Sequence, residues 1–327
     1  SSPDDSWWHS QIAQAVAVRR DLNLFQSDGQ NACRLVHAEG DGLPGLIADL
    51  YNGILVIQCH TPGMHRTLPT LTGAFREALG ECLVGIYDKS AKTLLKNGGQ
   101  ASDDGWIWGN APKEHFATEY GHQFDIDWEQ GQKTGFFLDQ RENRSLLGTL
   151  SQGKKILNVF SYTGGFSIYA LKAGATEVHS LDSSQRALEV CEKNVRLNGL
   201  SEDCHKSIRA DALEYLKTDT LGEYDIVVLD PPAFAKRASA RHAAIQGYKR
   251  INLRALQGMK SGSLLFTFSC SQAVDDAMFT NTIVAAAIQA GRTVRILHRL
   301  HQPPDHPVNA FHPEGSYLKG LVVRVDE

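Results

Sequence analysis

Residues 157–167, LNVFSYTGGFS, carry the pattern that decides the fold. A short apolar run ends in a turn that contains Gly164 and Gly165, and a helical pattern begins directly after the turn. A strand that passes through a glycine-containing turn into a helix is typical of nucleotide-binding α/β folds, because glycine lets the backbone approach a ligand at the strand's end. Paired glycines also occur in ordinary turns, so the interpretation depends on the other strand ends.

The chain after Gly153 alternates between strand and helix patterns. Strands are expected at 156–160, 177–182, 205–210, 224–230 and 263–269, with later ones near 294–300 and 317–325. Helices are expected at 166–173, 184–198, 212–217, 247–259 and 275–290. Such an alternation predicts an α/β fold with a parallel sheet covered by helices on both faces. The last two strands are separated by HPEG, which suggests that the final strand enters as part of an antiparallel hairpin.

The residues before this region follow a different pattern. Residues 1–25 have a helical apolar rhythm, and residues 26–128 consist of short β-like runs with one helix-like segment. We therefore expect a lead-in helix or linker over 1–25, a smaller α+β domain over 26–128, and the α/β domain over 129–327.

The composition excludes several classes of protein. No apolar run approaches the ~18 residues of a membrane span. The six cysteines form no C-x-x-C pair, which favours free thiols in a reducing cytoplasm over disulfides or a zinc site, and no metal is expected. The net charge of −4 excludes nucleic-acid binding through bulk charge alone.

One segment departs from this acidic balance. The chain between Pro231 and Val274 contains no Asp or Glu. Its basic residues are Lys236, Arg237, Arg241, Lys249, Arg250, Arg254 and Lys260. On charge alone, a solvated basic face is the simpler interpretation. The alternative is a local nucleic-acid surface, for which Lys236, Arg237 and Arg241 are the candidates.

Acidic residues end the second and third expected strands. Asp182 lies near the customary distance for an acid that accepts both ribose hydroxyls, and the carboxylate of Asp211 can meet an adenine amine. An Asp before a helix is also a common N-cap. Together with Gly164 and Gly165, these residues favour a nucleoside cofactor. The turn lacks the G-x-G-x-x-G spacing that seats a pyrophosphate, so S-adenosylmethionine fits better than a dinucleotide.

Two further candidates end the fourth and fifth strands. In LDPPAF, Asp230 can bind the amine edge of a flat base, and the two prolines stiffen its turn. In FTFSCS, Cys270 would flank the same pocket. The C5 atom of cytosine is a poor nucleophile, and a thiolate that adds to C6 activates it. Methylation of an exocyclic amine needs no thiol, and Cys270 would then be small apolar filler.

The five segments GQKTGFFLDQRENR, LNVFSYTGGFS, LDPPAFAK, FTFSCS and DHPVNAFHPEGSYLKG resemble the RlmI family of bacterial 23S rRNA cytosine-C5 methyltransferases and its class I relatives. The similarity runs from about Arg34 to the C-terminus. It implies a C-terminal Rossmann-like methyltransferase domain with a seven-stranded sheet, preceded by a smaller α+β domain that helps to present RNA. It also implies S-adenosylmethionine as the cofactor and 23S rRNA or a large-subunit precursor as the partner.

The resemblance also assigns roles to single residues. The family's nucleophile falls on Cys270 and its base-facing acid on Asp230. The methionine and ribose ends of the cofactor fall around Phe160, Ser161, Gly164, Asp182 and Ser183. Related enzymes close over the cofactor at FLDQR, so Asp139, Gln140 and Arg141 could contact the target base or the methionine carboxylate. The alternative for these three is a capped helix start with an ion pair.

Two observations bear on the choice of reaction. A related branch that methylates guanine N7 shares DPP-x-F but has Asn where Cys270 lies, so Cys270 favours cytosine. Family members usually begin with a PUA domain that binds RNA, and the residues before Trp7 do not supply one. The alternatives are methylation of a base nitrogen, at guanine N7 or an exocyclic amine, and a catalytically idle RNA-binding module.

Overall fold

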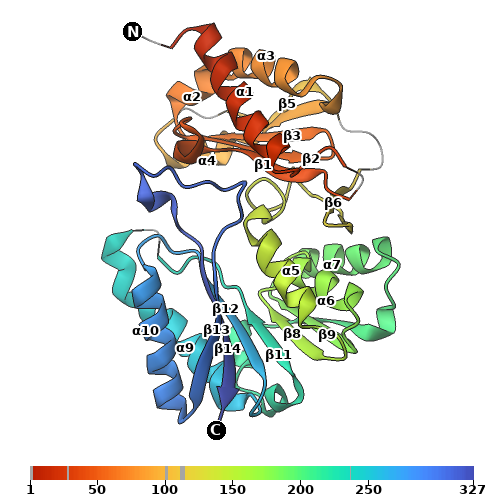
Figure 1. The fold of residues 1–327 in the computed structure, drawn as a ribbon, viewed down its shortest axis with the longest axis vertical. Coiled ribbons are helices and arrows are strands. Elements are labelled where there is room, and N and C mark those ends of the chain that lie inside the picture. The colour runs from red at the N-terminus through yellow and green to blue at the C-terminus, as the bar shows by residue number, and fades with distance from the viewer. Residues whose placement is uncertain (1–2, 28, 100–101, 111–114, 236) are drawn as a thin grey trace. The chain divides into compact units, whose positions relative to one another are not determined.

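The computed structural model describes residues 3–27, 29–99, 102–110, 115–235 and 237–327, and its contacts divide the chain into two units (Figure 1). The first unit comprises Ser1–Arg141 and Pro303–Gly315, and the second comprises Glu142–Gln302 and Ser316–Glu327. This division differs from the expected one. Residues 129–141 group with the first unit, and so does a segment that lies near the end of the sequence.

The first unit is built on a five-stranded sheet in the order β1-β2-β3-β4-β5. Its strands are β1 (Ala32–His37), β2 (Leu46–Tyr51), β3 (Ile54–Cys59), β4 (Gly85–Asp88) and β5 (Gly105–Gly109), and β6 (Ala117–Glu119) and β7 (His122–Phe124) form a separate pair. Its helices are α1 (Asp5–Asp21), α2 (Pro62–Arg66), α3 (Leu68–Leu79) and α4 (Ala91–Lys96). The helix α1 packs against α3 and buries Ile12 and Val16 in one core with Phe75. Residues 5–21 are therefore part of this core.

The second unit contains a seven-stranded sheet in the order β10-β9-β8-β11-β12-β14-β13. The strands are β8 (Lys155–Val159), β9 (Glu177–Asp182), β10 (His205–Arg209), β11 (Ile226–Leu229), β12 (Leu264–Ser269), β13 (Thr293–Leu300) and β14 (Lys319–Asp326). The first five pair in parallel, and β14 runs antiparallel to both β12 and β13. The Rossmann-like α/β fold and the closing antiparallel hairpin are confirmed.

Helices cover this sheet and supply much of its core. They are α5 (Arg141–Thr149), α6 (Gly165–Lys172), α7 (Gln185–Leu197), α8 (Ala212–Tyr215), α9 (Arg241–Gly258) and α10 (Asp276–Ala290). Ile251 of α9 and Phe279 of α10 share a hydrophobic cluster with Leu157 and Leu265 of the sheet. None of the helices in the described ranges combines the length and hydropathy needed to cross a membrane.

One helix boundary differs clearly from its expected position. The helix α9 begins at Arg241, whereas the sequence indicated a start at Gly247. Gly247 lies inside the helix, where the Phe234 ring packs against it, and a Cβ atom there would lie 2.9 Å from Phe234 Cδ2. This glycine therefore makes room for an aromatic ring, a use that local sequence does not reveal.

The register of the parallel strands aligns the candidate residues along one edge of the sheet. Val159 of β8 pairs with Leu181 of β9 and with Leu229 of β11, and Leu229 also pairs with Thr267 of β12. The carboxyl ends of these strands therefore lie beside one another. Ligands in open α/β sheets bind at this edge.

Candidate active site

The turn after β8 holds a strained backbone close to the end of β9. Phe160 and Tyr162 have φ angles of 62° and 47°, which are left-handed values that disfavour residues with a Cβ atom by about 1 kcal/mol or more each. Ser161 N donates to Leu181 O over 3.0 Å, and Tyr162 N donates to Asp182 Oδ2 over 2.9 Å. Such strain persists only where surrounding contacts hold it, and it gathers at ligand sites.

Asp182 is the residue that organises this edge of the sheet. Its Oδ2 accepts from Tyr162 N, and its Oδ1 accepts from Ser184 N over 2.9 Å. Ser184 in turn is the N-cap of α7. The exposed Ser183 lies between Asp182 and Ser184 in the sequence. A carboxylate has about four acceptor positions, so Asp182 can hold the turn and still accept hydroxyl groups of a ribose.

The packing of α7 against the turn explains why residue 164 is glycine. Its φ is 82°, and a Cβ atom at this position would lie 2.3 Å from the sulfur of Cys191 in α7. The absence of a side chain therefore allows α7 to pack against the turn. Gly165 is the buried first residue of α6. The expectation that these glycines let a ligand approach stays a prediction.

Two hydroxyl groups in the same turn fit a bound ligand. Among the residues that the structure describes, Ser161 Oγ and Thr163 Oγ1 are buried and have no hydrogen-bond partner. A buried polar group without a partner destabilises the folded state by roughly 1–3 kcal/mol. Polar groups of a ligand at this edge would satisfy them, and these donors and acceptors suit the amino acid and ribose portions of S-adenosylmethionine.

Asp211 is the N-cap of α8, as one interpretation of the sequence predicted. Its Oδ1 accepts from Glu214 N over 3.0 Å, and the residue is exposed. The N-cap role is confirmed, and contact with an adenine amine stays a prediction.

Asp230 and Cys270 follow two strands that lie side by side. Asp230 comes directly after β11, and Cys270 comes directly after β12. The Cys270 sulfur lies 4.0 Å from the carbonyl oxygen of Pro231, the residue that follows Asp230. The structure therefore brings the candidate nucleophile against the turn that carries the candidate acid.

Cys270 differs from the thiols that act as core filler. Cys59 and Cys191 are buried, and burial raises the pKa of each to about 12, which keeps them protonated near neutral pH. Cys270 is partly exposed. Exposure is one condition for a reactive thiol, and a neighbouring positive charge that favours the thiolate is another.

Three residues that the sequence did not single out hold the strand end around Cys270. The buried Ser271 Oγ accepts from Ala235 N over 3.2 Å and bonds the Tyr248 hydroxyl over 2.8 Å. Lys319 Nζ donates to the Ser271 carbonyl oxygen over 2.8 Å. Burial raises the pKa of Tyr248, so its hydroxyl stays protonated. Only pairing between distant segments reveals these residues.

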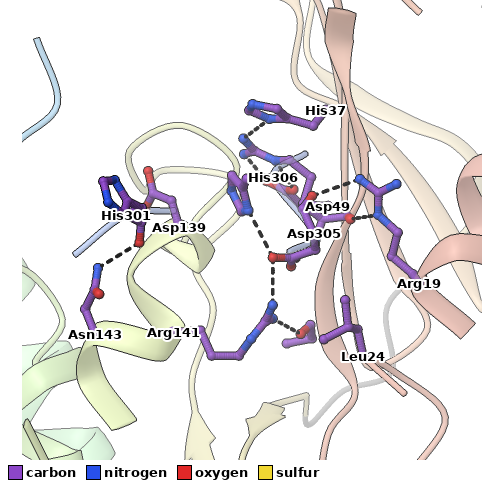
Figure 2. A network of polar contacts seen from close by, with 12 residues as sticks. Arg19, Leu24, His37, Asp49, Asp139, Arg141, Asn143, His301, Asp305 and His306 are labelled. Atoms are coloured by element: carbon purple, nitrogen blue, oxygen red, sulfur yellow. Dashed lines mark hydrogen bonds and ion pairs between the residues drawn. The ribbon is translucent and has the colours of Figure 1, made fainter. Parts of the chain in front are cut away.

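Asp139, Gln140 and Arg141 of the FLDQR stretch lie in the first unit and are buried. Asp139 and Gln140 belong to a 3-10 helix (Leu138–Gln140), and Lys133 lies 3.6 Å from Asp139. Arg141 is 0% exposed and forms an ion pair with Asp305 at 2.6 Å (Figure 2). The alternative interpretation, a helix start with an ion pair, therefore describes Arg141. Contact of the three residues with RNA or cofactor stays a prediction.

The basic candidates are placed only in part. Arg237 and Arg241 are exposed, and Arg241 Nε donates to Ala273 O over 2.7 Å. Lys236 lies outside the described residues. Arg241 thus ties the start of α9 to the loop after Cys270.

A hollow lies away from this edge of the sheet. It is lined by Glu192, Val195, Glu202, His205 and Ser207, along α7 and the start of β10, and it includes none of the candidate residues. In the described ranges, no group of three His, Cys, Asp or Glu side chains could hold a metal ion.

Comparisons with known proteins match the chain to one family. A family model described as S-adenosylmethionine-dependent methyltransferase matches residues 33–324. Ribosomal RNA large subunit methyltransferase I of Aeromonas hydrophila is 41% identical over 305 residues, which cover 92% of this chain and 76% of that protein. The protein of the same name from Shewanella amazonensis is 40% identical over 325 residues, which cover 98% and 81%.

A solved structure shows the same fold. The methyltransferase SMU.776, crystallised in complex with SAH, superposes with a TM-score of 0.86 at 23% identity and covers 99% of this chain and 82% of its own. The strand-end geometry and the relatives agree with the methyltransferase fold and the cofactor expected from the sequence. The chain therefore belongs to the ribosomal RNA large subunit methyltransferase I family of S-adenosylmethionine-dependent methyltransferases.

Proposed function

We propose that this enzyme methylates C5 of a cytosine in 23S ribosomal RNA, or in a large-subunit precursor, in the cytoplasm. One observation carries the proposal: a partly exposed cysteine directly follows β12 and lies against the turn that follows Asp230. The relatives named as ribosomal RNA large subunit methyltransferases support the RNA substrate.

The edge formed by β8, β9 and β10 would hold the cofactor. Bound S-adenosylmethionine supplies an electrophilic methyl group. Asp182 would accept the ribose hydroxyls, Asp211 would face the adenine amine, and the buried hydroxyls of Ser161 and Thr163 would bond the polar groups of the amino acid portion. Because the neighbouring turn is already held by backbone hydrogen bonds, little ordering would accompany binding.

The edge formed by β11 and β12 would act on the base. The Cys270 thiolate forms a bond to C6 of cytosine, and the electron pair of the C5–C6 double bond makes C5 nucleophilic. Asp230 would accept a hydrogen bond from the N4 amine of the base and hold the C5–C6 bond against the sulfur. Once C5 carries the new methyl group, with S-adenosylhomocysteine as the other product, a base would remove the C5 proton, the double bond would return and the C6–S bond would break, which releases the thiolate.

The variant Cys270→Ala tests this assignment. We expect the loss of measurable methylation of 23S rRNA, with cofactor binding and melting temperature near those of the unmodified enzyme, because the covalent path has no substitute. Cys204→Ala is the matched control, since Cys204 is also a partly exposed free thiol and should keep full activity.

An RNA substrate with 5-fluorocytosine at the target gives a second measurement. The fluorine cannot leave as a proton does, so the enzyme should stay bonded to the RNA in a denaturing gel, and Cys270→Ala should not. Methylation by Cys270→Ala at a near-normal rate would overturn the proposal and indicate a base nitrogen as the acceptor.

A further inference from the structure

The ammonium group of Lys319 lies at the end of β12, where the two neighbours of Cys270 hold it. Lys319 is the first residue of β14 and pairs in register with Ser269. Its Nζ donates to the carbonyl oxygen of Ser271 over 2.8 Å and to that of Tyr317 over 2.6 Å. One neighbour of Cys270 therefore sets the register of Lys319, and the other accepts a hydrogen bond from it.

This ammonium is enclosed by protein, and no carboxylate among the described residues forms an ion pair with it. Lys319 is 2% exposed, and no carboxylate of the described residues lies within 4.0 Å of its Nζ. Burying a charged amine without an anion is unfavourable by several kcal/mol. Burial accordingly lowers the pKa of Lys319, while the Asp276 carboxylate, the Cys270 side chain in its thiolate form and the Asp275 carboxylate act in the opposite direction. The site thus favours an anion that forms close to this ammonium.

Cys270 is the candidate counter-ion among the ionisable groups at this end of the sheet, which also include Asp230 after β11. Asp275 and Asp276 are exposed at the start of α10, and Asp275 Oδ1 accepts from Met278 N over 2.8 Å. The Tyr248 hydroxyl bonds Ser271, and burial raises its pKa. A phosphate of RNA cannot reach an ammonium that is enclosed by protein. The thiolate of Cys270 is a suitable counter-charge, since Cys270 stands between the two residues that place Lys319.

We propose that Lys319 is a positioning residue that stabilises the thiolate form of Cys270. The inference rests on the proposed function, in which this sulfur attacks C6. The thiol proton leaves to solvent, the thiolate pairs with the ammonium, and Lys319 itself neither gains nor loses a proton. When the C6–S bond breaks at the end of the reaction, the same ammonium receives the expelled thiolate. The thiolate is the nucleophilic form, so Lys319 would raise the reactive fraction near neutral pH.

Alkylation of the full-length chain by iodoacetamide, without RNA or cofactor, tests this directly. The rate at Cys270 is followed by peptide mass spectrometry across pH 6–10, with Cys82 and Cys204 in the same sample as internal controls. In the unmodified chain, Cys270 should react faster at pH 7 than the exposed Cys82. A slower reaction would overturn the inference without the need for any variant.

Two variants sharpen the test. Lys319→Gln keeps a donor for the carbonyl oxygens and removes the charge, and Lys319→Met removes both. We expect alkylation of Cys270 at pH 7 to fall about tenfold or more in each, which corresponds to one unit or more on the pH axis, and to recover near pH 10. The rates at Cys82 and Cys204 should not change. An unchanged pH profile in folded Lys319→Gln would show that Lys319 only joins strands.

The outcome is separable from that of the proposed function. Because the alkylation contains no RNA, normal methylation by Cys270→Ala would disprove the covalent reaction and leave the measured effect of Lys319 on the sulfur intact. Loss of methylation in Cys270→Ala with unchanged alkylation in Lys319→Gln would disprove the role of Lys319 alone.

Discussion

Two buried cations, Arg141 in the first unit and Lys319 in the second, have different partners. In the first unit, Arg141 forms an ion pair with Asp305 at 2.6 Å, and both side chains are fully buried. In the second unit, the partners of Lys319 among the described residues are backbone carbonyl oxygens. A compensated buried charge fits a structural role, whereas an uncompensated one destabilises the fold and is tolerated where chemistry needs it.

The Asp305 cluster shows what compensation involves. Asp305 Oδ2 accepts from Arg34 N over 2.9 Å, its backbone carbonyl accepts from Arg19 over 2.8 Å, and His306 Nδ1 lies 3.1 Å from Oδ1 (Figure 2). Burial opposes the negative charge, but Arg141 and His306 hold the pKa of Asp305 well below its usual range. This carboxylate therefore fastens residues 303–315 to α1, to β1 and to Arg141 within the first unit.

The largest expected effect is that of Asp305→Ala. Removing this carboxylate leaves Arg141 buried without its partner, and we expect the free energy of unfolding to fall by about 3–5 kcal/mol. All five tryptophans lie within residues 1–141, so tryptophan fluorescence during urea denaturation reports on the first unit. Glu77→Ala is the control, because its exposed pair with His9 lies in the same unit and should contribute about 0.5 kcal/mol or less. If Asp305→Ala lowers the free energy of unfolding by less than about 1 kcal/mol, the ion pair between Arg141 and Asp305 does not have the structural role assigned to it.

An intermediate effect is expected for a carboxylate of the second unit. Asp182→Ala should weaken S-adenosylmethionine binding about tenfold, or ~1.4 kcal/mol, because it removes a charge-assisted pair of hydrogen bonds. Isothermal titration calorimetry measures the affinity, and the melting temperature reports the removal of the bonds to Tyr162 N and Ser184 N.

Asp182→Asn sharpens this test, since it keeps one side-chain carbonyl oxygen as an acceptor. It should bind the cofactor with an affinity between those of Asp182→Ala and the unmodified enzyme. A lower melting temperature with unchanged affinity would make Asp182 a structural residue like Asp305 and would show that the cofactor pocket has been misplaced.

The smallest effect is expected for the exposed basic residues. Replacing Arg237 and Arg241 with Ala should weaken RNA binding and reduce the slope of log affinity against log salt by about two at most, because each arginine can neutralise one phosphate. Filter binding over a range of salt concentrations measures the slope. Arg196→Ala is the control, because Arg196 is exposed and paired with Glu202. If the unmodified enzyme, the double variant and Arg196→Ala all show the same slope, Arg237 and Arg241 are part of a solvated face.

Local pattern was sufficient for the elements of the second unit. The predicted strand 177–182 coincides with β9, and the predicted helix 275–290 differs from α10 by one residue at its start. Apolar runs, glycine turns and N-caps are properties of neighbouring residues, so a sequence carries them directly. Parallel pairing then places residues that follow successive strands at one edge, which is why Asp230 and Cys270 could be named together.

The unit boundaries required the tertiary structure. Asp305 joins the first unit because its carboxylate meets Arg141 and the backbone of Arg34, both more than half the chain away in sequence. The burial of Asp139, Gln140 and Arg141 also depends on the tertiary structure, because only folding encloses these side chains. Charge compensation between distant segments leaves no periodic signal in either segment.

The sequence by itself therefore determined the Rossmann-like fold, the family and the residues at the strand ends, because each depends on a local run followed by a turn. The tertiary structure alone decided which groups surround them. The pairing of β14 with β12 brings Lys319 to Ser269 and Ser271, and the fold buries its ammonium against backbone carbonyl oxygens. Burial and charge compensation are properties of packing in three dimensions, so no spacing along the chain could have marked this lysine.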